Sequence, residues 1–114
     1  MISTPELSGV VPFYNEAAVA GGVIDELIDC MTRLGRTFEL VLVDDGSSDE
    51  TSEVLRMAQQ RSPSCRVLRH PRNLGQAAAL WNGLHAARGS ILITLDGDGQ
   101  NDPGDLPCLA VRKP

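Results

Sequence analysis

Apolar and polar residues alternate along the chain in blocks that predict strands separated by helices. Four short runs rich in β-branched and aliphatic residues are interpreted as strands: Ser8–Pro12, Phe38–Val43, Cys65–Arg69 and Ile91–Leu95. The second and fourth runs are nearly all apolar, which is typical of parallel strands covered on both faces. The pattern therefore predicts an α/β fold with a mainly parallel sheet and flanking helices.

Three longer segments between these runs have the three- and four-residue apolar spacing of helices. The first presents an apolar stripe over residues 19–34, with Asn15 as a candidate N-cap. The second is expected to begin after Ser48 or Asp49, either of which can cap it. The third, Gln76–Ala87, is rich in small residues and is expected to pack closely on the sheet.

Composition narrows the classes of protein that fit this pattern. The chain has 114 residues and is 42% hydrophobic, which suits one compact domain over residues 1–114. Its 10 basic and 15 acidic residues give a net charge of -5, which argues against a nucleic-acid-coating surface. Three cysteines without metal-ligand spacing, and no apolar leader, predict reduced thiols in the cytoplasm. No apolar run approaches the roughly 18 residues of a spanning helix, so any membrane contact is expected to be peripheral.

Two of the predicted strands end in acidic, glycine-bearing loops, at the edge where open α/β sheets bind ligands. Asp96 and Asp98 flank Gly97, so two carboxylates can face one point while the glycine lets a ligand approach. Carboxylate oxygens in this arrangement suit Mg²⁺ or Mn²⁺, which complete their coordination with water and substrate phosphates. A solvated Asp-Gly turn without a ligand explains the same residues, so both interpretations stay open.

The other acidic loop contains Asp44 and Asp45, whose like charges are unfavourable side by side unless a donor or a cation uses them. A nucleobase or ribose edge is one candidate, and the alternative is that the loop only caps the following helix. Arg72, ahead of the third helix with Asn73 and Gly75, is a candidate contact for a phosphate or a sugar. An ordinary surface arginine is the alternative.

Other residues receive structural rather than chemical interpretations. His70 has no partner that the sequence reveals and is interpreted as an ordinary loop residue. Trp81 lies in the middle of the third predicted helix and is expected to pack against the rest of the domain. Neither Ser47 nor any cysteine has a recognisable base and orienting partner, so nucleophilic catalysis has no support.

Four short motifs follow one another with one strand-helix unit between successive members. They span residues 12–16, 43–51, 72–75 and 96–103, and begin Pro-Phe-Tyr-Asn-Glu, Val-Asp-Asp-Gly-Ser, Arg-Asn-Leu-Gly and Asp-Gly-Asp-Gly-Gln. Together they resemble the family 2 glycosyltransferases, above all dolichyl-phosphate mannose synthases and their bacterial polyprenyl-phosphate relatives. The resemblance covers nearly the whole chain. It implies the nucleotide-binding, amino-terminal half of a GT-A (Rossmann-like) fold, truncated before the acceptor half, with residues 106–113 starting the next helix.

The resemblance also implies roles for individual residues. The base and ribose pocket would be lined by Pro12, Tyr14 and Glu16, and closed around the nucleobase by Val43 and Asp45. The remaining contacts to the nucleotide sugar would come from Asp96, Gly97 and Asp98. The metal ion, Mg²⁺ or Mn²⁺, would be held by Asp96 and Asp98, with Gln100 as a further metal or phosphate contact.

The implied reaction is an inverting transfer of a hexose from a UDP- or GDP-sugar to an acceptor, which in these relatives is a polyprenyl phosphate. The chain is then expected in the cytoplasm, in contact with the cytoplasmic face of a membrane. Two alternatives are kept. One is a truncated, non-catalytic fragment of such an enzyme. The other is a phosphoacceptor receiver module, which also combines paired aspartates with Mg²⁺ but places the pair after its first strand.

Overall fold

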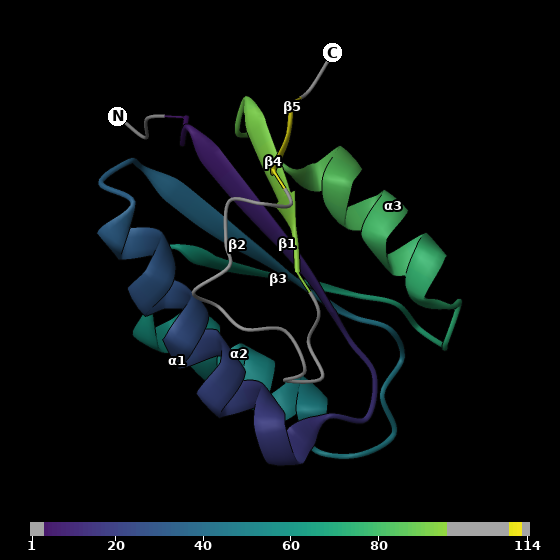
Figure 1. The fold of residues 1–114 in the computed structure, drawn as a ribbon. Helices are drawn as coiled ribbons and strands as arrows, with labels where there is room; N and C mark the ends of the chain where they lie inside the picture. Colours follow the sequence, from purple (N-terminus) through teal and green to yellow (C-terminus); the bar gives the residue numbers. More distant parts are fainter. Residues whose placement is uncertain (1–3, 96–109, 113–114) are drawn as a thin grey trace.

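The computed structural model of the chain describes residues 4–95 and the backbone of residues 110–112 (Figure 1). Its strands are β1 (Leu7–Phe13), β2 (Phe38–Asp44), β3 (Cys65–Arg69), β4 (Ile91–Thr94) and β5 (Ala110–Arg112). Its helices are α1 (Ala17–Arg33), α2 (Thr51–Arg61) and α3 (Gln76–Ala86). The predicted alternation of strands and helices is confirmed up to β4.

The sheet has the strand order β3-β2-β1-β4-β5, with β1 to β4 parallel and β5 antiparallel to β4. β1 is central because it pairs with β2 along one edge and with β4 along the other. The chain moves outward from β1 to β3 and then crosses back to β4, so the strand order reverses beside β1. Open α/β sheets bind ligands at such a reversal, outside the carboxyl ends of the strands.

Strand β5 replaces the start of a helix that the sequence predicted over residues 106–113. Its three residues pair with β4, with Ala110 opposite Ile93. An edge strand presents unpaired N–H and C=O groups, and pairing satisfies them. A helix would also have to end before Pro114, which leaves few residues for it. The helix prediction was therefore wrong for residues 110–112.

Helices α1 and α2 cover one face of the sheet and α3 covers the other, which gives three layers (Figure 1). Successive strand side chains alternate between two cores, as they must in a sheet. The core under α1 and α2 includes Val11, Phe13, Leu40, Leu42, Ile24, Leu27 and Met31. The core under α3 is smaller and consists of Val10, Val41, Val43, Ala79, Ala87 and Leu92.

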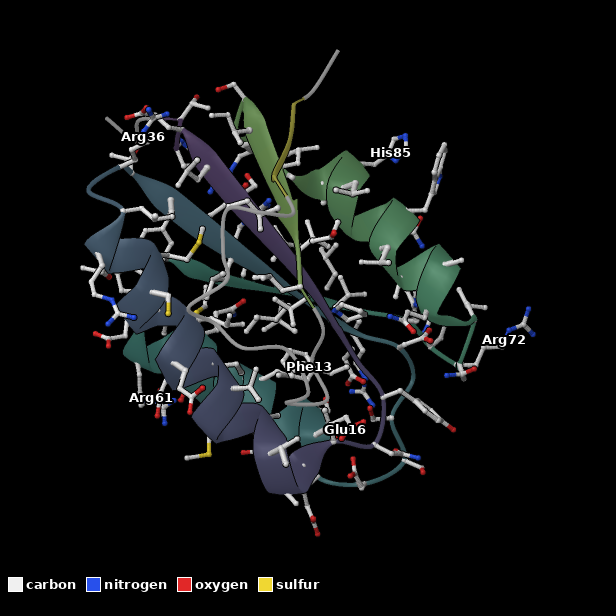
Figure 2. The ribbon with its side chains drawn as sticks, viewed as in Figure 1. Phe13, Glu16, Arg36, Arg61, Arg72 and His85 are labelled. Carbon is white, nitrogen blue, oxygen red and sulfur yellow. The ribbon has the colours of Figure 1, made fainter. Side chains whose placement is uncertain are left out.

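Helix α3 approaches the sheet closely, as predicted, because Gly83 faces β1. A Cβ atom on Gly83 would lie 2.4 Å from Val10 Cγ1, which is closer than packed atoms allow. The prediction that Trp81 packs into the domain was wrong, since its side chain is 64% exposed. Small residues occupy the sheet-facing side of α3, so Trp81 lies outward, where its ring contacts His85 in a tilted arrangement with ring centroids 4.3 Å apart. Figure 2 shows His85 on this outward side.

A buried carboxylate joins the amino-terminal ends of the strands. Glu39 is 2% exposed and accepts hydrogen bonds from Ser8 Oγ at 2.6 Å, Arg66 Nε at 2.9 Å and the Arg88 backbone N–H at 2.7 Å. The Arg88 guanidinium also reaches it at 3.1 Å. Burial raises the pKa of Glu39, but these hydrogen bonds and positive charges offset that effect and hold the pKa below its ordinary value. Glu39 is therefore an ionised link between β1, β2, β3 and the start of β4.

Two cysteines of the described residues lie in the interior as free thiols. Cys30 and Cys65 are both buried. Burial raises the pKa of the Cys65 thiol, which keeps it protonated and unreactive. Cys108 lies outside the described residues.

Candidate functional site

A cavity of about 320 Å³ opens where β1, β2 and β3 reach their carboxyl ends. Its lining includes four of the residues singled out in the sequence, Pro12, Tyr14, Glu16 and Asp45. The lining is completed by Phe13, Asn73, Gly75 and Gln76. Figure 2 shows Phe13 and Glu16 at this end of β1. The loops that follow three neighbouring strands thus supply the walls of one cavity.

The wall that follows β1 offers both apolar and acidic surface to a ligand. The Tyr14 side chain is 46% exposed, so its ring is accessible from the cavity. The backbone N–H of Glu16 donates to Thr51 Oγ1 at 2.8 Å, which fixes this residue at the start of α1. The Glu16 carboxylate has no partner among the described residues and can accept hydrogen bonds from ligand hydroxyl groups.

Asp45 holds the wall formed by the residues that follow β3. Its carboxylate is buried, and each oxygen accepts two hydrogen bonds from the segment 70–75. One oxygen accepts from His70 Nδ1 at 2.8 Å and from the Leu74 N–H at 2.9 Å. The other accepts from Asn73 Nδ2 and from the Gly75 N–H, both at 3.0 Å. One buried charge therefore determines the path of the loop that ends at α3.

Gly46 allows the same loop to lie against the end of β2. Its φ of 72° is in the left-handed region, which favours glycine. A Cβ atom there would also lie 2.2 Å from the Arg72 carbonyl carbon and 2.4 Å from the Asn73 backbone nitrogen. The backbone of residues 72–73 therefore packs directly on Gly46. This close approach brings the Asn73 amide and the N–H groups of Leu74 and Gly75 within reach of Asp45.

His70 is a site residue that the sequence interpretation missed. It is 7% exposed, and its Nε2 lies 2.9 Å from Asn82 Nδ2 on α3. A carboxylate can only accept, so His70 Nδ1 carries the proton given to Asp45, and Nε2 accepts from the Asn82 amide. The interpretation as an ordinary loop residue was wrong, because Asp45 is 25 residues away along the chain and local pattern does not report such a pair. The only signal in the sequence for this role of His70 was its place shortly before Asn73 and Gly75, ahead of a helix.

Asp44 and Asp45, although adjacent, bond to different parts of the fold. Asp44 is fully buried, and its Oδ1 accepts the Ser47 N–H at 3.0 Å. Its Oδ2 has no hydrogen-bond partner among the described residues, and the nearest positive group is Arg69 Nε at 3.9 Å. Asp44 thus supports the turn toward α2, whereas Asp45 supports the loop toward α3.

The turns after β1 and β2 are also joined to each other. Asn15 was predicted to cap α1, but the N-cap residue is Glu16, which makes no side-chain capping bond. Asn15 Oδ1 instead accepts the N–H groups of Ser48 at 2.8 Å and Asp49 at 3.4 Å. The prediction was wrong because the orphan donors of the neighbouring turn compete for the same oxygen.

Asp49 acts at the beginning of both helices on this face. Its Oδ1 accepts the N–H of Thr51, the first residue of α2, at 2.9 Å. The N-cap of α2 is Glu50, which makes no side-chain capping bond, so the prediction of Ser48 or Asp49 as the N-cap was wrong. Asp49 Oδ2 accepts the N–H of Ala17, the first residue of α1, at 3.3 Å. The hydrogen bonds from Thr51, first that of its hydroxyl and then that of its N–H, lower the pKa of Asp49. A negative charge at two helix N-termini is also favoured by the helix dipoles.

Two candidate residues are not brought to the cavity. The Val43 side chain is fully buried in the core under α3, with its Cγ2 facing Gly83. Arg72 is exposed, and Figure 2 shows it projecting outward from the loop before α3. Neither side chain is part of the described cavity lining.

The candidate metal ligands Asp96, Asp98 and Gln100, together with Gly97, lie outside the described residues. Leu95, which precedes Asp96, donates its N–H to the Val10 carbonyl at 2.9 Å, so β4 ends beside β1. Two carboxylates and an amide oxygen are hard ligands of the kind that Mg²⁺ and Mn²⁺ prefer. Among residues 4–95, no group of three or more His, Cys, Asp or Glu side chains is arranged to hold a metal ion.

Comparison with protein families matches residues 8–111 to glycosyl transferase family 2. The chain belongs to this family. The match runs from the first residues of β1 into β5 and includes all four motifs described above. Membership of this glycosyltransferase family also decides against the phosphoacceptor receiver alternative.

Relatives of this family 2 glycosyltransferase chain include enzymes named for polyprenyl phosphates. The chain is 39% identical over 109 residues to dodecaprenyl-phosphate galacturonate synthase of Rhizobium johnstonii, covering 95% of this chain and 32% of the relative. It is 43% identical over 107 residues to undecaprenyl-phosphate 4-deoxy-4-formamido-L-arabinose transferase of Pseudomonas aeruginosa, covering 93% and 32%. The chain therefore spans about a third of the length of these relatives.

Solved structures of GT-A glycosyltransferases share the fold. A mannosyltransferase from Pyrobaculum calidifontis, in complex with GDP-mannose and Mn²⁺, is 29% identical with a TM-score of 0.67, over 84% of this chain and 28% of that one. Glucosyl-3-phosphoglycerate synthase from Mycobacterium tuberculosis, in complex with Mn²⁺, UDP and glucosyl-3-phosphoglycerate, is 28% identical with a TM-score of 0.64, over 82% and 33%. The predicted GT-A architecture is thereby confirmed. In the part of the chain that the structure describes, no helix has the length and apolar character needed to cross a bilayer.

Proposed function

We propose that this chain is the donor-binding domain of a hexosyltransferase, which binds a UDP- or GDP-sugar together with Mg²⁺ or Mn²⁺. The observation that carries the proposal is the cavity lined by Pro12, Tyr14, Glu16 and Asp45, beside the strand that leads to Asp96. Solved neighbours contain GDP-mannose or UDP with Mn²⁺, which supports the same ligand class here. Residues 1–114 act as a single domain in this proposal.

The residues around the cavity divide the recognition of the donor among them. The exposed Tyr14 ring offers a flat apolar surface to a nucleobase, and the unpaired Glu16 carboxylate offers acceptors to ribose hydroxyls. Pro12 forms part of the cavity lining, and Val43 belongs to the core under α3.

The diphosphate end of the donor is assigned to the segment after β4. Asp96 and Asp98 hold the metal ion with Gln100, and Gly97 permits close approach of the diphosphate. When bound, the ion supplies positive charge that stabilises the departing nucleoside diphosphate. The chain itself contributes orientation, because its cavity holds the nucleoside beside the end of β4.

The acceptor is proposed to be a polyprenyl phosphate, as the names of the two relatives suggest. Such an acceptor carries its own nucleophilic phosphate oxygen, so the reaction does not require a strong general base. Because the acceptor is embedded in a bilayer, we place the protein in peripheral contact with the cytoplasmic face of a membrane.

Calorimetry with Mn²⁺ and UDP or GDP tests donor binding. Wild-type protein is expected to bind one of the nucleotides only in the presence of the metal, and Asp98→Ala is expected to abolish this metal-dependent binding. Asp29→Ala, which removes an exposed carboxylate of α1, is the matched control and should bind like wild type. Absence of binding by the wild type, or unchanged binding by Asp98→Ala, would refute the proposal.

A turnover assay separates donor binding from catalysis. The chain and a full-length relative are incubated with labelled UDP- or GDP-sugar, Mn²⁺ and a polyprenyl phosphate, and labelled lipid is measured. Product from both indicates an active transferase. Binding without turnover by this chain supports the alternative of a non-catalytic, donor-binding fragment.

A further inference from the structure

The Asp45 carboxylate has little acceptor capacity left for a ligand. A carboxylate offers about four lone-pair sites, and four hydrogen bonds from the segment 70–75 already occupy them. A ligand that bonded to this carboxylate would have to displace one of these bonds inside a buried site. Asp45 therefore contributes to the cavity through the loop that it holds.

Among the four donors to Asp45, His70 is the one that also bonds to α3, through Asn82. The bonds run in one direction, from the Asn82 amide to His70 Nε2 and from His70 Nδ1–H to Asp45. Such chains of hydrogen bonds polarise and strengthen one another. Asn82 belongs to α3, which is packed on the sheet through Gly83, so the ring is anchored to a rigid element.

The wall that depends on this chain is part of the cavity. Asn73, Gly75 and Gln76 line it, and two of these three bond to Asp45 directly. If the His70 bond is lost, that carboxylate oxygen keeps only the Leu74 N–H, and the whole carboxylate is held by three hydrogen bonds in place of four. The wall would then lose its fixed distance from Tyr14 and Glu16 on the other side.

We infer that His70 is a positioning residue, which sets the shape of the nucleotide cavity through Asp45 while Asn82 fixes its ring. This inference rests on the proposed function, since it takes a nucleoside diphosphate as the occupant of the cavity. It assigns His70 no contact with the ligand and no role in proton transfer to it.

Two substitutions at His70 separate positioning from simple packing. His70→Asn places an amide nitrogen where Nδ1 lies and can still donate to Asp45, but it cannot reach Asn82. His70→Gln extends to the position of Nε2 and loses the donor to Asp45. Both remove the buried ring, so both lower stability for the same reason. The matched control is His85→Asn, since His85 is exposed on α3 and its Nδ1 is paired only with the Trp81 carbonyl in the described part of the chain.

Affinity for UDP or GDP with Mn²⁺ is measured by calorimetry at a temperature where every variant is folded. His70→Asn and His85→Asn are expected to bind with Kd within about threefold of wild type, and His70→Gln about tenfold or more weakly, as expected for loss of a hydrogen bond to a charged group. Equal Kd values for the two His70 variants would overturn the inference, because loss of packing alone affects both.

A measurement without nucleotide keeps this result distinct from failure of the proposed function. Nitrogen-15 NMR of wild-type protein is expected to identify His70 as the Nδ1–H tautomer. Amide exchange at Leu74 and Gly75 is expected to accelerate in His70→Gln but not in His70→Asn. If wild-type protein binds neither nucleotide, the proposed ligand is wrong. An Nε2–H tautomer, or equal exchange in the two variants, shows instead that the positioning role is wrong.

Discussion

Asn15 accepts a hydrogen bond from the Ser48 N–H at 2.8 Å, and this contact joins the turn after β1 to the turn after β2. The connection runs in both directions, because the Asn15 N–H donates to Ser47 Oγ at 3.0 Å. Asn15 has a φ of 52°, in the left-handed region that asparagine tolerates better than most residues. The two turns that flank Tyr14 and Asp45 therefore form one rigid unit beside the cavity.

Removal of the Asn15 side chain tests this unit. Asn15→Ala loses the acceptor and places an alanine at positive φ, so the free energy of unfolding is expected to fall by about 1–3 kcal/mol. Urea denaturation followed by circular dichroism measures the change. Asn15→Asp retains an acceptor oxygen and should recover most of the loss, whereas an aspartate variant as unstable as the alanine variant contradicts the assigned role.

Gly46 and Gly35 offer a matched pair for the loop that Asp45 holds. Both have φ near the same positive value, 72° and 73°, but a Cβ atom on Gly35 would meet nothing within 4 Å. Gly35→Ala is expected to cost only the conformational penalty of about 1–2 kcal/mol. Gly46→Ala is expected to cost more and to weaken nucleotide binding, because the added carbon collides with the backbone of residues 72–73.

Thermal unfolding and calorimetry on these two alanine variants give the comparison. The difference between them isolates the close approach of the loop from the cost of positive φ. Equal losses of stability, with nucleotide binding intact in Gly46→Ala, would mean that the loop accommodates the methyl group without moving.

Most of the fold could be predicted because its signals are local. β2 and β4 are nearly continuous apolar runs, and the stripe on α1 repeats at helical spacing over residues 19–34. β1 was predicted over residues 8–12 and runs one residue further at each end, with the weak strand formers Ser8 and Gly9 inside it. Both suit the central position: Ser8 donates to Glu39, and a Cβ on Gly9 would lie 2.8 Å from Leu40 Cδ2.

The site was predicted in outline and not in its internal contacts. The family resemblance assigned Tyr14, Glu16 and Asp45 to one pocket, and these residues do line one cavity. The bond between Asp45 and His70 could not be foreseen, because it depends on how the β3–α3 loop folds back over Gly46. Sequence pattern reports the period of an element, but it does not report which distant donor a buried carboxylate selects.

Glu39 is expected to be the largest single electrostatic contribution to stability among the described residues. Glu39→Gln leaves Arg66 and Arg88 without their negative partner, and because both arginines are partly exposed the loss is expected to be about 1–3 kcal/mol. Glu53→Gln is the control, since Glu53 pairs with Arg56 on the exposed face of α2, where solvent screens the ion pair. Urea denaturation at neutral pH compares the two. Similar small losses in both variants would contradict the importance of the buried cluster.

The same residue predicts how stability depends on pH. The pKa of Glu39 is lower in the folded protein than its ordinary value of 4.5, so the unfolded chain binds the proton more readily. Stability from Glu39 is therefore fully present above about pH 5 and is lost as the pH falls below 4.5 through the folded pKa. Asp49, whose pKa is also lowered, adds a loss of the same sign.

Comparison of wild type with Glu39→Gln isolates the contribution of this one group, because Asp49 titrates in both proteins. The difference in their free energies of unfolding, measured by urea denaturation from neutral to acidic pH, is expected to be constant above about pH 5 and to shrink below it. Whether this difference shrinks or grows at acidic pH shows whether folding lowers or raises the pKa of Glu39. A difference that grows as the pH falls would mean that the folded state raises the pKa of Glu39, in which case burial outweighs the hydrogen bonds from Ser8 and Arg88.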